Sequence, residues 1–374
     1  MLSKIFIEGL YGLHSYELDL HPEKNPYLFV TGPNAYGKTS LLRMLSSLYN
    51  LDFRSLSDIV FDKFGLGFDD GFKIDVTQRR FYANSEDSDE VLPQRVELTF
   101  VSGRNISAKE EFLWASDQEE KSKLNNMTAY LASHPIYMIM DNRLYMGGSD
   151  ASVGDSLQAK MRGFLQDLER KLNAELQKGM LEEQDAISED LYGEKMSNLQ
   201  PMIDSIIKYG LVGKSPIPAY SKEKAAFCHS CLVALENALQ EEVLDGIAKL
   251  NAFFNIIENY AFAKKRLELS PYYGFRFKAE DEMSSILSFE QLSSGERHIV
   301  LMNYDILFDV ADEALVLVDE PELSLHLEWQ GQFLENLNEL TGVRRDLQFV
   351  ICTHAPEMFG YDWALSVDLY EQAK

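Results

Sequence analysis

Two acidic residues directly follow an apolar run near the end of the chain. The stretch ALVLVDEPELSLH, residues 314–326, places Asp319 and Glu320 after five apolar residues. An apolar run of this length is typical of a strand that is buried on both faces. Burying a carboxylate is costly unless a cation or a proton takes up its charge. The pair therefore predicts a partner for that charge, a cation or a proton, at the end of a buried strand.

A glycine-rich loop near the N-terminus indicates which partner this is. GPNAYGKT, residues 32–39, has two glycines separated by four residues and followed by Lys and Thr, which is the pattern of a phosphate-binding loop. Glycines let backbone N–H groups turn toward phosphate oxygens, and the N-terminus of the helix that follows favours anions. We expect Lys38 to reach the β- and γ-phosphates of a nucleotide, and Thr39 to hold Mg²⁺ through its hydroxyl. The expected nucleotide-binding residues of this loop are Gly32, Pro33, Asn34, Ala35, Tyr36, Gly37, Lys38, Thr39 and Ser40.

The acidic pair then has a defined role. We expect Asp319 to reach the Mg²⁺ directly or through water, so that the cation offsets the burial of the carboxylate. Glu320 is placed to polarise the attacking water as a general base. Glu322 has the position of a first-turn helix acid, which the helix dipole favours.

The elements that must position these residues alternate between strands and helices. YLFVTG, residues 27–32, is a short apolar run ending in glycine, and residues 38–50 carry an apolar stripe at helical spacing. PIYMIM, residues 135–140, predicts another buried strand. Alternation of apolar and polar residues predicts further, antiparallel strands at 4–8, 15–20, 72–82 and 94–101.

The chain is expected to have three segments within an α/β architecture. Residues 1–150 would form a first lobe with the glycine loop and the antiparallel strands. Residues 151–270, rich in Leu, Ala, Glu, Lys and Gln at helical spacing, would form a helical insertion. Residues 271–374, where strands and helices alternate again, would form the second lobe.

A serine-glycine segment precedes the acidic strand. LSSGERHIVL, residues 292–301, predicts a helix that starts at Ser293, Ser294 and Gly295 and continues into Glu296. Taken alone, it is the ordinary serine-capped start of a helix. Its place in the chain, shortly before the acidic strand and far from the glycine loop, gives it a second interpretation.

In this order the motifs resemble those of ABC-type ATPases, whose signature motif is LSGGQ-like. FVICTHAPEM, residues 349–358, extends the resemblance, because His354 follows a buried strand where the family has a histidine that contacts the γ-phosphate. The segments IFIEGLYGLHSYEL, GPNAYGKTSLL and VDEPELSLH are similar to the SMC, RecF and OLD-like branch. The acidic segment particularly resembles ATPase subunits of bacterial anti-phage systems such as OLD-type, Septu and PARIS.

The resemblance implies an ABC-ATPase head, which is a P-loop fold with a mixed sheet, antiparallel strands in lobe I and, here, a helical insertion. It implies ATP and Mg²⁺ as ligands, and Glu320 and His354 as the catalytic residues. It also implies that each nucleotide lies between two heads, with Ser293, Ser294, Gly295 and Glu296 of one head facing the γ-phosphate bound to the other. An ATP-dependent homodimer, or a higher homo-oligomer built from such dimers, is therefore expected.

Three functions remain open within this family. The first is an ATPase sensor or scaffold in phage defence that controls a separately encoded effector, such as an HNH or TOPRIM nuclease. Because the chain ends soon after His354, we expect no TOPRIM domain in it. The second is a RecF- or SMC-like DNA-repair ATPase that binds DNA directly, and the third is a nucleotide-gated clamp without hydrolysis.

Two further residues are candidates by position in the family. The glutamine loop of this branch follows a strand of the first lobe, and IYMIMDNRLY is the best match. Asp141, Asn142 or Arg143 would then approach the metal or the γ-phosphate, which makes Asp141 an additional candidate metal ligand. No Gln occupies that segment, so a plain polar strand end is an equal alternative. Tyr11 is the candidate aromatic residue near the adenine.

The composition limits the partners and the compartment. The chain of 374 residues has a formal net charge of −25, which disfavours a wholly basic groove for nucleic acid. Its 3 cysteines, Cys228, Cys231 and Cys352, favour a reducing compartment over a disulfide framework. Cys228 and Cys231 form a CxxC motif without a second pair, which favours core packing over zinc. With no apolar run of membrane-spanning length and no signal-peptide pattern, we expect a cytoplasmic protein that does not enter the membrane.

Overall fold

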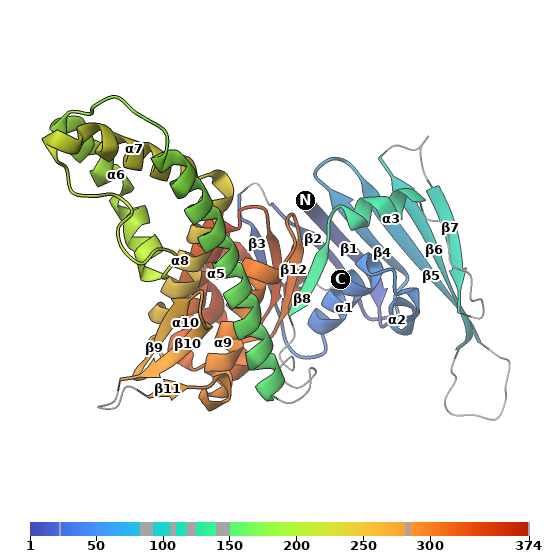
Figure 1. Cartoon of the computed structure of the whole chain (residues 1–374). Coiled ribbons are helices and arrows are strands. Elements are labelled where there is room, and N and C mark those ends of the chain that lie inside the picture. Colours follow the sequence, from blue (N-terminus) through green and yellow to red (C-terminus); the bar gives the residue numbers. More distant parts are fainter. Residues whose placement is uncertain are drawn as a thin grey trace. The chain divides into compact units, whose positions relative to one another are not determined.

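The computed structural model describes residues 1–21, 24–82, 93–104, 110–116, 125–139, 150–280 and 285–372. The chain divides into two compact units (Figure 1). The first comprises residues 1–141 and 309–374, and the second comprises residues 142–308. Residues 271–308, which include the serine-glycine helix start, therefore group with the helical segment and not with residues 309–374.

A parallel sheet forms one half of the first unit. Within the described ranges it has five strands in the order β14-β3-β13-β12-β8. All four pairings are parallel, and the central strand β13 is buried along its whole length. Continuous burial explains why these segments read as unbroken apolar runs. The strands are β3 (Tyr27–Thr31), β8 (Ile136–Ile139), β12 (Leu315–Asp319), β13 (Gln348–Cys352) and β14 (Ser366–Asp368).

An antiparallel sheet forms the other half of this unit. Its described strands follow the order β2-β1-β4-β5-β6-β7. The alternation that predicted strands at 4–8, 15–20, 72–82 and 94–101 is confirmed, because inward and outward side chains alternate along these strands. The strands are β1 (Leu2–Leu10), β2 (His14–Asp19), β4 (Lys63–Phe68), β5 (Lys73–Tyr82), β6 (Pro93–Gly103) and β7 (Glu110–Ala115).

One apolar core joins the two sheets of the first unit. The apolar face of α1, including Leu41, Leu42 and Leu45, packs together with inward-facing residues of both sheets. Because α1 begins at Lys38, this packing fixes the direction in which the glycine loop points. The described α-helices of the unit are α1 (Lys38–Tyr49), α2 (Phe53–Asp58), α3 (Asn125–Ala132), α10 (Leu327–Val343) and α11 (Leu369–Gln372).

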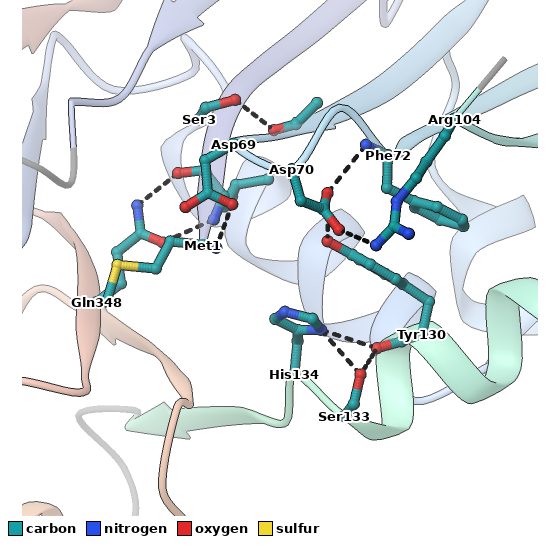
Figure 2. Close-up of polar contacts among 12 residues, drawn as sticks. Met1, Ser3, Asp69, Asp70, Phe72, Arg104, Tyr130, Ser133, His134 and Gln348 are labelled. Carbon is teal, nitrogen blue, oxygen red and sulfur yellow. Dashed lines mark hydrogen bonds and ion pairs between the residues drawn. The ribbon is translucent and has the colours of Figure 1, made fainter.

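Polar contacts surround the first residues of β1 and the start of β13 (Figure 2). The side chain of Gln348, at the start of β13, accepts from the backbone N–H of Leu2 at 3.0 Å and donates to its carbonyl oxygen at 2.7 Å. Nearby, the Asp70 carboxylate accepts hydrogen bonds from the Tyr130 hydroxyl at 3.0 Å and from the Arg104 guanidinium. The Gln348 contacts link β1 of the antiparallel sheet to β13 of the parallel sheet, and the Asp70 contacts link the β4–β5 turn to α3.

The second unit is built around one long helix. Helix α5 (Asp150–Met180) packs against α7 through Gly179 and Ala234 near one end, and against β10 through Gly274 near the other (Figure 1). The other helices are α6 (Glu189–Lys208), α7 (Ala225–Ala238), α8 (Glu241–Asn259) and α9 (Ser294–Tyr304). The described strands are β9 (Lys265–Ser270), β10 (Gly274–Ala279) and β11 (Ile286–Leu287), in antiparallel order β11-β10-β9.

The expected helical insertion at 151–270 is not helical to its end. Helix α8 ends at Asn259, and the last residues of the segment form β9. The physical reason is the period of the sequence: KRLELS alternates polar and apolar residues, and the structure buries Leu267 and Leu269. The thiols of Cys228 and Cys231 are free and lie buried in the packing of α7.

The expected fold class is confirmed as an α/β head with the glycine loop on a parallel sheet, antiparallel strands in its first lobe and an inserted helical part. Among the described strands, the parallel and antiparallel ones form two separate sheets and not the single mixed sheet that was expected. Among the described helices, none is long and apolar enough to cross a membrane.

Candidate functional site

Three neighbouring strands bring the predicted residues to one edge of the parallel sheet. The Cα partners Asp319–Cys352 and Cys352–Val30 place the ends of β12, β13 and β3 side by side. The carboxyl ends of parallel strands lie at the same edge, and ligands bind in the crevice outside that edge. The glycine loop, Glu320 and His354 each follow one of these strands.

The backbone of the glycine loop requires its glycines. Gly37 lies at φ +88° immediately before α1, in the left-handed region that side-chain-bearing residues rarely adopt. A Cβ at this position would lie 2.4 Å from Cδ2 of Leu10, at the end of β1. The loop is further held by Tyr16 on β2, whose hydroxyl donates to the carbonyl oxygen of Tyr36 at 2.7 Å. The neighbouring His14 ring stacks on the Tyr36 ring with centroids 4.9 Å apart.

The Lys38 side chain lies inside this loop. Its ammonium donates to the carbonyl oxygens of Gly32 at 2.8 Å and Pro33 at 3.3 Å. The residue is 5% exposed, and burial lowers the pKa of Lys38, against the opposing charges of neighbouring acids. A buried ammonium that donates to two backbone carbonyl groups favours an added anion, because an anion stabilises its charged form.

Thr39 and Asp319 meet across the edge of the sheet. The Thr39 hydroxyl donates to Oδ1 of Asp319 at 3.4 Å. Burial raises the pKa of Asp319 above its ordinary value, although the hydrogen bond from Thr39 and the charges of Arg43 and Lys38 act in the opposite direction. A carboxylate and a hydroxyl at this separation fit Mg²⁺, which proteins hold by one or two carboxylates while substrate phosphates supply other oxygens.

Glu320 faces His354. Its backbone lies in the left-handed region at φ 48° and ψ 54°, and its N–H donates to the carbonyl oxygen of Cys352 at 2.9 Å. This conformation is rare for a residue with a side chain, and strained residues of this kind cluster at functional sites. It turns the carboxylate toward β13, where Oε1 lies 3.4 Å from Nε2 of His354. Both side chains are about one third exposed, at 28% for Glu320 and 36% for His354.

Glu322 has a contact that its sequence position did not indicate. It lies in the short 3₁₀ turn Pro321–Ser324, and the residue is 8% exposed. Its Oε1 accepts the backbone N–H of His354 at 2.6 Å. The acid is therefore buried against the end of β13, and its position in the first helical turn does not account for that burial. The contact between Glu322 and His354 appears only in the folded structure, and neither residue's local sequence predicts it.

The serine-glycine helix start belongs to the second unit. Ser293 is the N-cap of α9, its hydroxyl accepts the N–H of Glu296 at 3.3 Å, and the Glu296 carboxylate accepts the N–H of Ser293 at 2.7 Å. This reciprocal pair is a capping box. Glu296 is 4% exposed and is also paired with the ammonium of Lys265 on β9 at 2.7 Å. Ser293 and Ser294 themselves are exposed at the helix N-terminus, and Gly295 is buried.

Of the two candidates suggested by the resemblance, Asp141 and Tyr11, the structure describes only Tyr11. Asp141 lies outside the described residues, as does the rest of the DNRLY segment. Tyr11 is 46% exposed, and its hydroxyl lies 2.9 Å from Oγ of Ser40, the last expected residue of the glycine loop. It also lines a cavity of about 480 Å³ along α1, together with Arg43 and Asp58.

The sequence matches a family model over residues 28–358, and the family is described as "AAA domain, putative AbiEii toxin, Type IV TA system". The match spans most of the chain. The chain belongs to this family of ATPase domains. The expectation that the chain is an ATPase of a known family is thereby confirmed. No curated protein matches the chain.

Solved structures similar to the chain include SMC head domains. The head of Pyrococcus furiosus Smc, with an extended coiled coil and bound to the C-terminal domain of ScpA, matches with 12% identity and a TM-score of 0.42, covering 98% of this chain and 92% of the other. The SMC head domain from Thermotoga maritima has 9% identity, a TM-score of 0.39, and the same two coverages, 98% and 92%. A Pyrococcus yayanosii Smc head with a coiled coil and joint has 13% identity and a TM-score of 0.40, covering 98% and 94%. The family membership rests on the sequence match.

Proposed function

We propose that the chain binds ATP with Mg²⁺ and hydrolyses it to ADP and phosphate. The observation that carries the proposal is the hydrogen bond between Thr39, which follows the glycine loop, and Asp319, which ends the acidic strand. It joins the expected phosphate-binding and metal-binding residues at one edge of one sheet. Membership of an ATPase family supports the same conclusion.

Each residue at this edge has a role in the proposal. The backbone N–H groups of residues 32–40 and the Lys38 ammonium bind the phosphates, as in other phosphate-binding loops. The Thr39 hydroxyl and the Asp319 carboxylate hold Mg²⁺, which on binding neutralises charge on the phosphate oxygens. Burial lowers the pKa of Lys38 and raises the pKa of Asp319, so it disfavours the charged form of each side chain. A phosphate beside Lys38 and a Mg²⁺ beside Asp319 would stabilise both charged forms.

Glu320 and His354 act on the water and the γ-phosphate. We assign Glu320 the role of general base, which orients a water and takes its proton as the oxygen attacks phosphorus. His354 contacts the γ-phosphate with its imidazole. Their mutual contact at 3.4 Å supports this assignment, because it keeps the base and the phosphate contact next to each other.

The helix start at α9 completes the site from a second copy of the chain. Ser293, Ser294 and Gly295 would offer hydroxyls and N–H groups to the γ-phosphate, since the first N–H groups of a helix have no partner within it. Glu296 contributes by holding this helix start in place through its contacts with Ser293 and Lys265. ATP then bridges two heads, and its hydrolysis removes the bridge.

In the cell, we propose that the ATPase acts as a sensor or scaffold in phage defence and controls a separately encoded effector such as an HNH or TOPRIM nuclease. The family description, which names a putative toxin of a type IV toxin–antitoxin system, supports a role of this kind. The net charge of −25 is suited to a protein partner rather than to DNA.

Purification from native cells should recover the effector. ATP-dependent binding of duplex DNA that weakens steeply with salt would instead favour the RecF-like function.

The ATPase proposal is tested by phosphate release in the presence of Mg²⁺ and in EDTA. The wild type should release phosphate only with Mg²⁺, and Lys38→Ala should bind ATP about 100-fold more weakly or worse, because it loses charge-assisted hydrogen bonds to the phosphates. Lys73→Ala, which changes an exposed lysine on β5 of the same unit, is the matched control and should behave as wild type. Equal ATP affinity in Lys38→Ala and the wild type would contradict the proposal.

A further inference from the structure

Glu322 is a buried acid that has no assigned role in the proposed binding or hydrolysis of ATP. One carboxylate oxygen accepts the backbone N–H of His354 at 2.6 Å. The other, Oε2, is buried and has no hydrogen-bond partner among the residues that the structure describes. An acid with one unpaired buried oxygen is costly to keep in a fold. The hydrogen bond that this side chain does make goes to the backbone of His354.

The turn that carries Glu322 is itself fixed from two sides. Pro321 begins the turn, and Glu320 precedes it in the left-handed region. From α10, the Gln330 amide donates to the carbonyl oxygens of Glu322 at 3.3 Å and Leu325 at 3.0 Å. These hydrogen bonds hold the backbone that presents the Glu322 carboxylate, so the carboxylate can fix the position of whatever it binds.

His354 is consequently held at two points by acids two residues apart. Glu320 faces its imidazole at 3.4 Å, and Glu322 binds its backbone N–H. On the other side of His354, the Ala355 N–H donates to Oγ1 of Thr353 at 3.0 Å, and the Thr353 N–H donates to the carbonyl oxygen of Val30 on β3 at 3.1 Å. The segment after β13 is thus anchored both to the glycine-loop strand and to the turn after Glu320.

We propose that Glu322 is a positioning residue for hydrolysis: it holds the His354 backbone so that the imidazole stays in place beside Glu320 and the γ-phosphate. This inference rests on the proposed ATPase function and assigns Glu322 a role within that site. Glu322 acts through His354 and has no contact of its own with the nucleotide. Displacing a catalytic group by about 1 Å is enough to slow a reaction about 100-fold, so one hydrogen bond at this place has a measurable effect on turnover.

The test compares Glu322→Gln with Glu322→Met in steady-state ATP hydrolysis. The two side chains have similar length, and only Gln keeps an oxygen that accepts the His354 N–H. We expect Glu322→Met to lower kcat about tenfold or more with less than a threefold change in KM, and Glu322→Gln to lose less than fivefold. Glu328→Gln, an exposed acid in the first turn of α10, is the control and should match the wild type.

A double-mutant cycle separates positioning from a general structural effect. In the His354→Ala background, Glu322→Met should cause no further loss of kcat, because the residue it positions is gone. Independent, multiplicative losses would overturn the inference, as would wild-type kcat in Glu322→Met. If Glu322→Met does not fold, Glu322→Ala takes its place in the same cycle. An inactive wild type would refute the ATPase proposal itself, whereas an active wild type with an unaffected Glu322→Met refutes this inference alone.

Discussion

Thr39 and Asp319 are 280 residues apart in the sequence, and the hydroxyl of one donates a hydrogen bond to the carboxylate of the other at 3.4 Å. The contact exists because β3 and β12 flank the same strand, β13, in a parallel sheet. It brings the end of the glycine loop and the end of the acidic strand within hydrogen-bonding distance of each other. The proposed Mg²⁺ site, and with it the roles of Lys38 and Glu320, depends on this pair.

Gly37 should tolerate no side chain, for two separable reasons. Gly37→Ala places a Cβ 2.4 Å from Leu10 and forces a left-handed backbone on alanine, which costs about 1–2 kcal/mol by itself. We expect a lower midpoint in urea unfolding and weaker ATP binding. Gly12→Ala is the matched control: it is at φ +71°, with nothing within 4 Å of the added Cβ, so it carries the backbone cost alone. Equal ATP affinity in the two variants would show that the Leu10 contact does not shape the loop.

In the absence of Mg²⁺, the charged Asp319 carboxylate should make the wild type less stable at neutral pH than a variant with an uncharged side chain at this position. Its folded-state pKa is raised by burial, so the protonated form favours the folded state, and stability is lost as the pH rises from the ordinary value of 3.8 through the folded-state pKa. Asp319→Asn keeps the acceptor for Thr39 and removes the charge. At pH 7 in EDTA the variant should therefore melt at a higher temperature than the wild type.

The same pair of proteins tests the metal role of Asp319. The difference in melting temperature should shrink as the pH falls below 3.8, because the carboxyl then becomes protonated in the unfolded state as well as in the folded state. Adding Mg²⁺ with ATP at pH 7 should stabilise the wild type more than the variant. A variant that is less stable than the wild type at pH 7, or a difference that does not change with pH, would contradict the sign of this effect.

Ser294 should be needed for pairing of heads and dispensable for folding. It is exposed at the N-terminus of α9, and Ser294→Arg adds a bulky side chain at the surface proposed to meet the γ-phosphate of a second copy. In light scattering, ATP should raise the mass of the wild type to at least a dimer and leave the variant unchanged. Ser156→Arg, at an exposed serine on α5 of the same unit, is the control. ATP-driven association that survives in Ser294→Arg would refute the assignment of this helix start.

Much of the site was predictable because the relevant signals are local. The glycine loop has its own spacing and lies between a buried strand and a helix. The acidic pair directly follows an apolar run, and the rule that ligands bind at the carboxyl edge of parallel strands brings the two together. His354 was predictable only through the resemblance, since a lone histidine after a strand has no specific signal.

The remaining features depend on contacts between distant segments. Glu322 resembles a helix-terminus acid in the sequence, and only the return of β13 beside it shows that it binds the backbone of His354. The pairing of Glu296 with Lys265 likewise requires β9 to lie beside the start of α9. The strand β9 itself was hidden by the helical composition of the residues before it.

The most direct test of the account is Glu320→Gln, measured for ATP binding and for phosphate release on the same preparation. Gln keeps the size of the side chain and removes the base, so we predict an ATP dissociation constant within about threefold of the wild type and a kcat lower by about 10²–10⁴-fold. The bound ATP should then accumulate and hold the heads together. Phosphate release by Glu320→Gln at the rate of the wild type would contradict the assignment of the acidic pair.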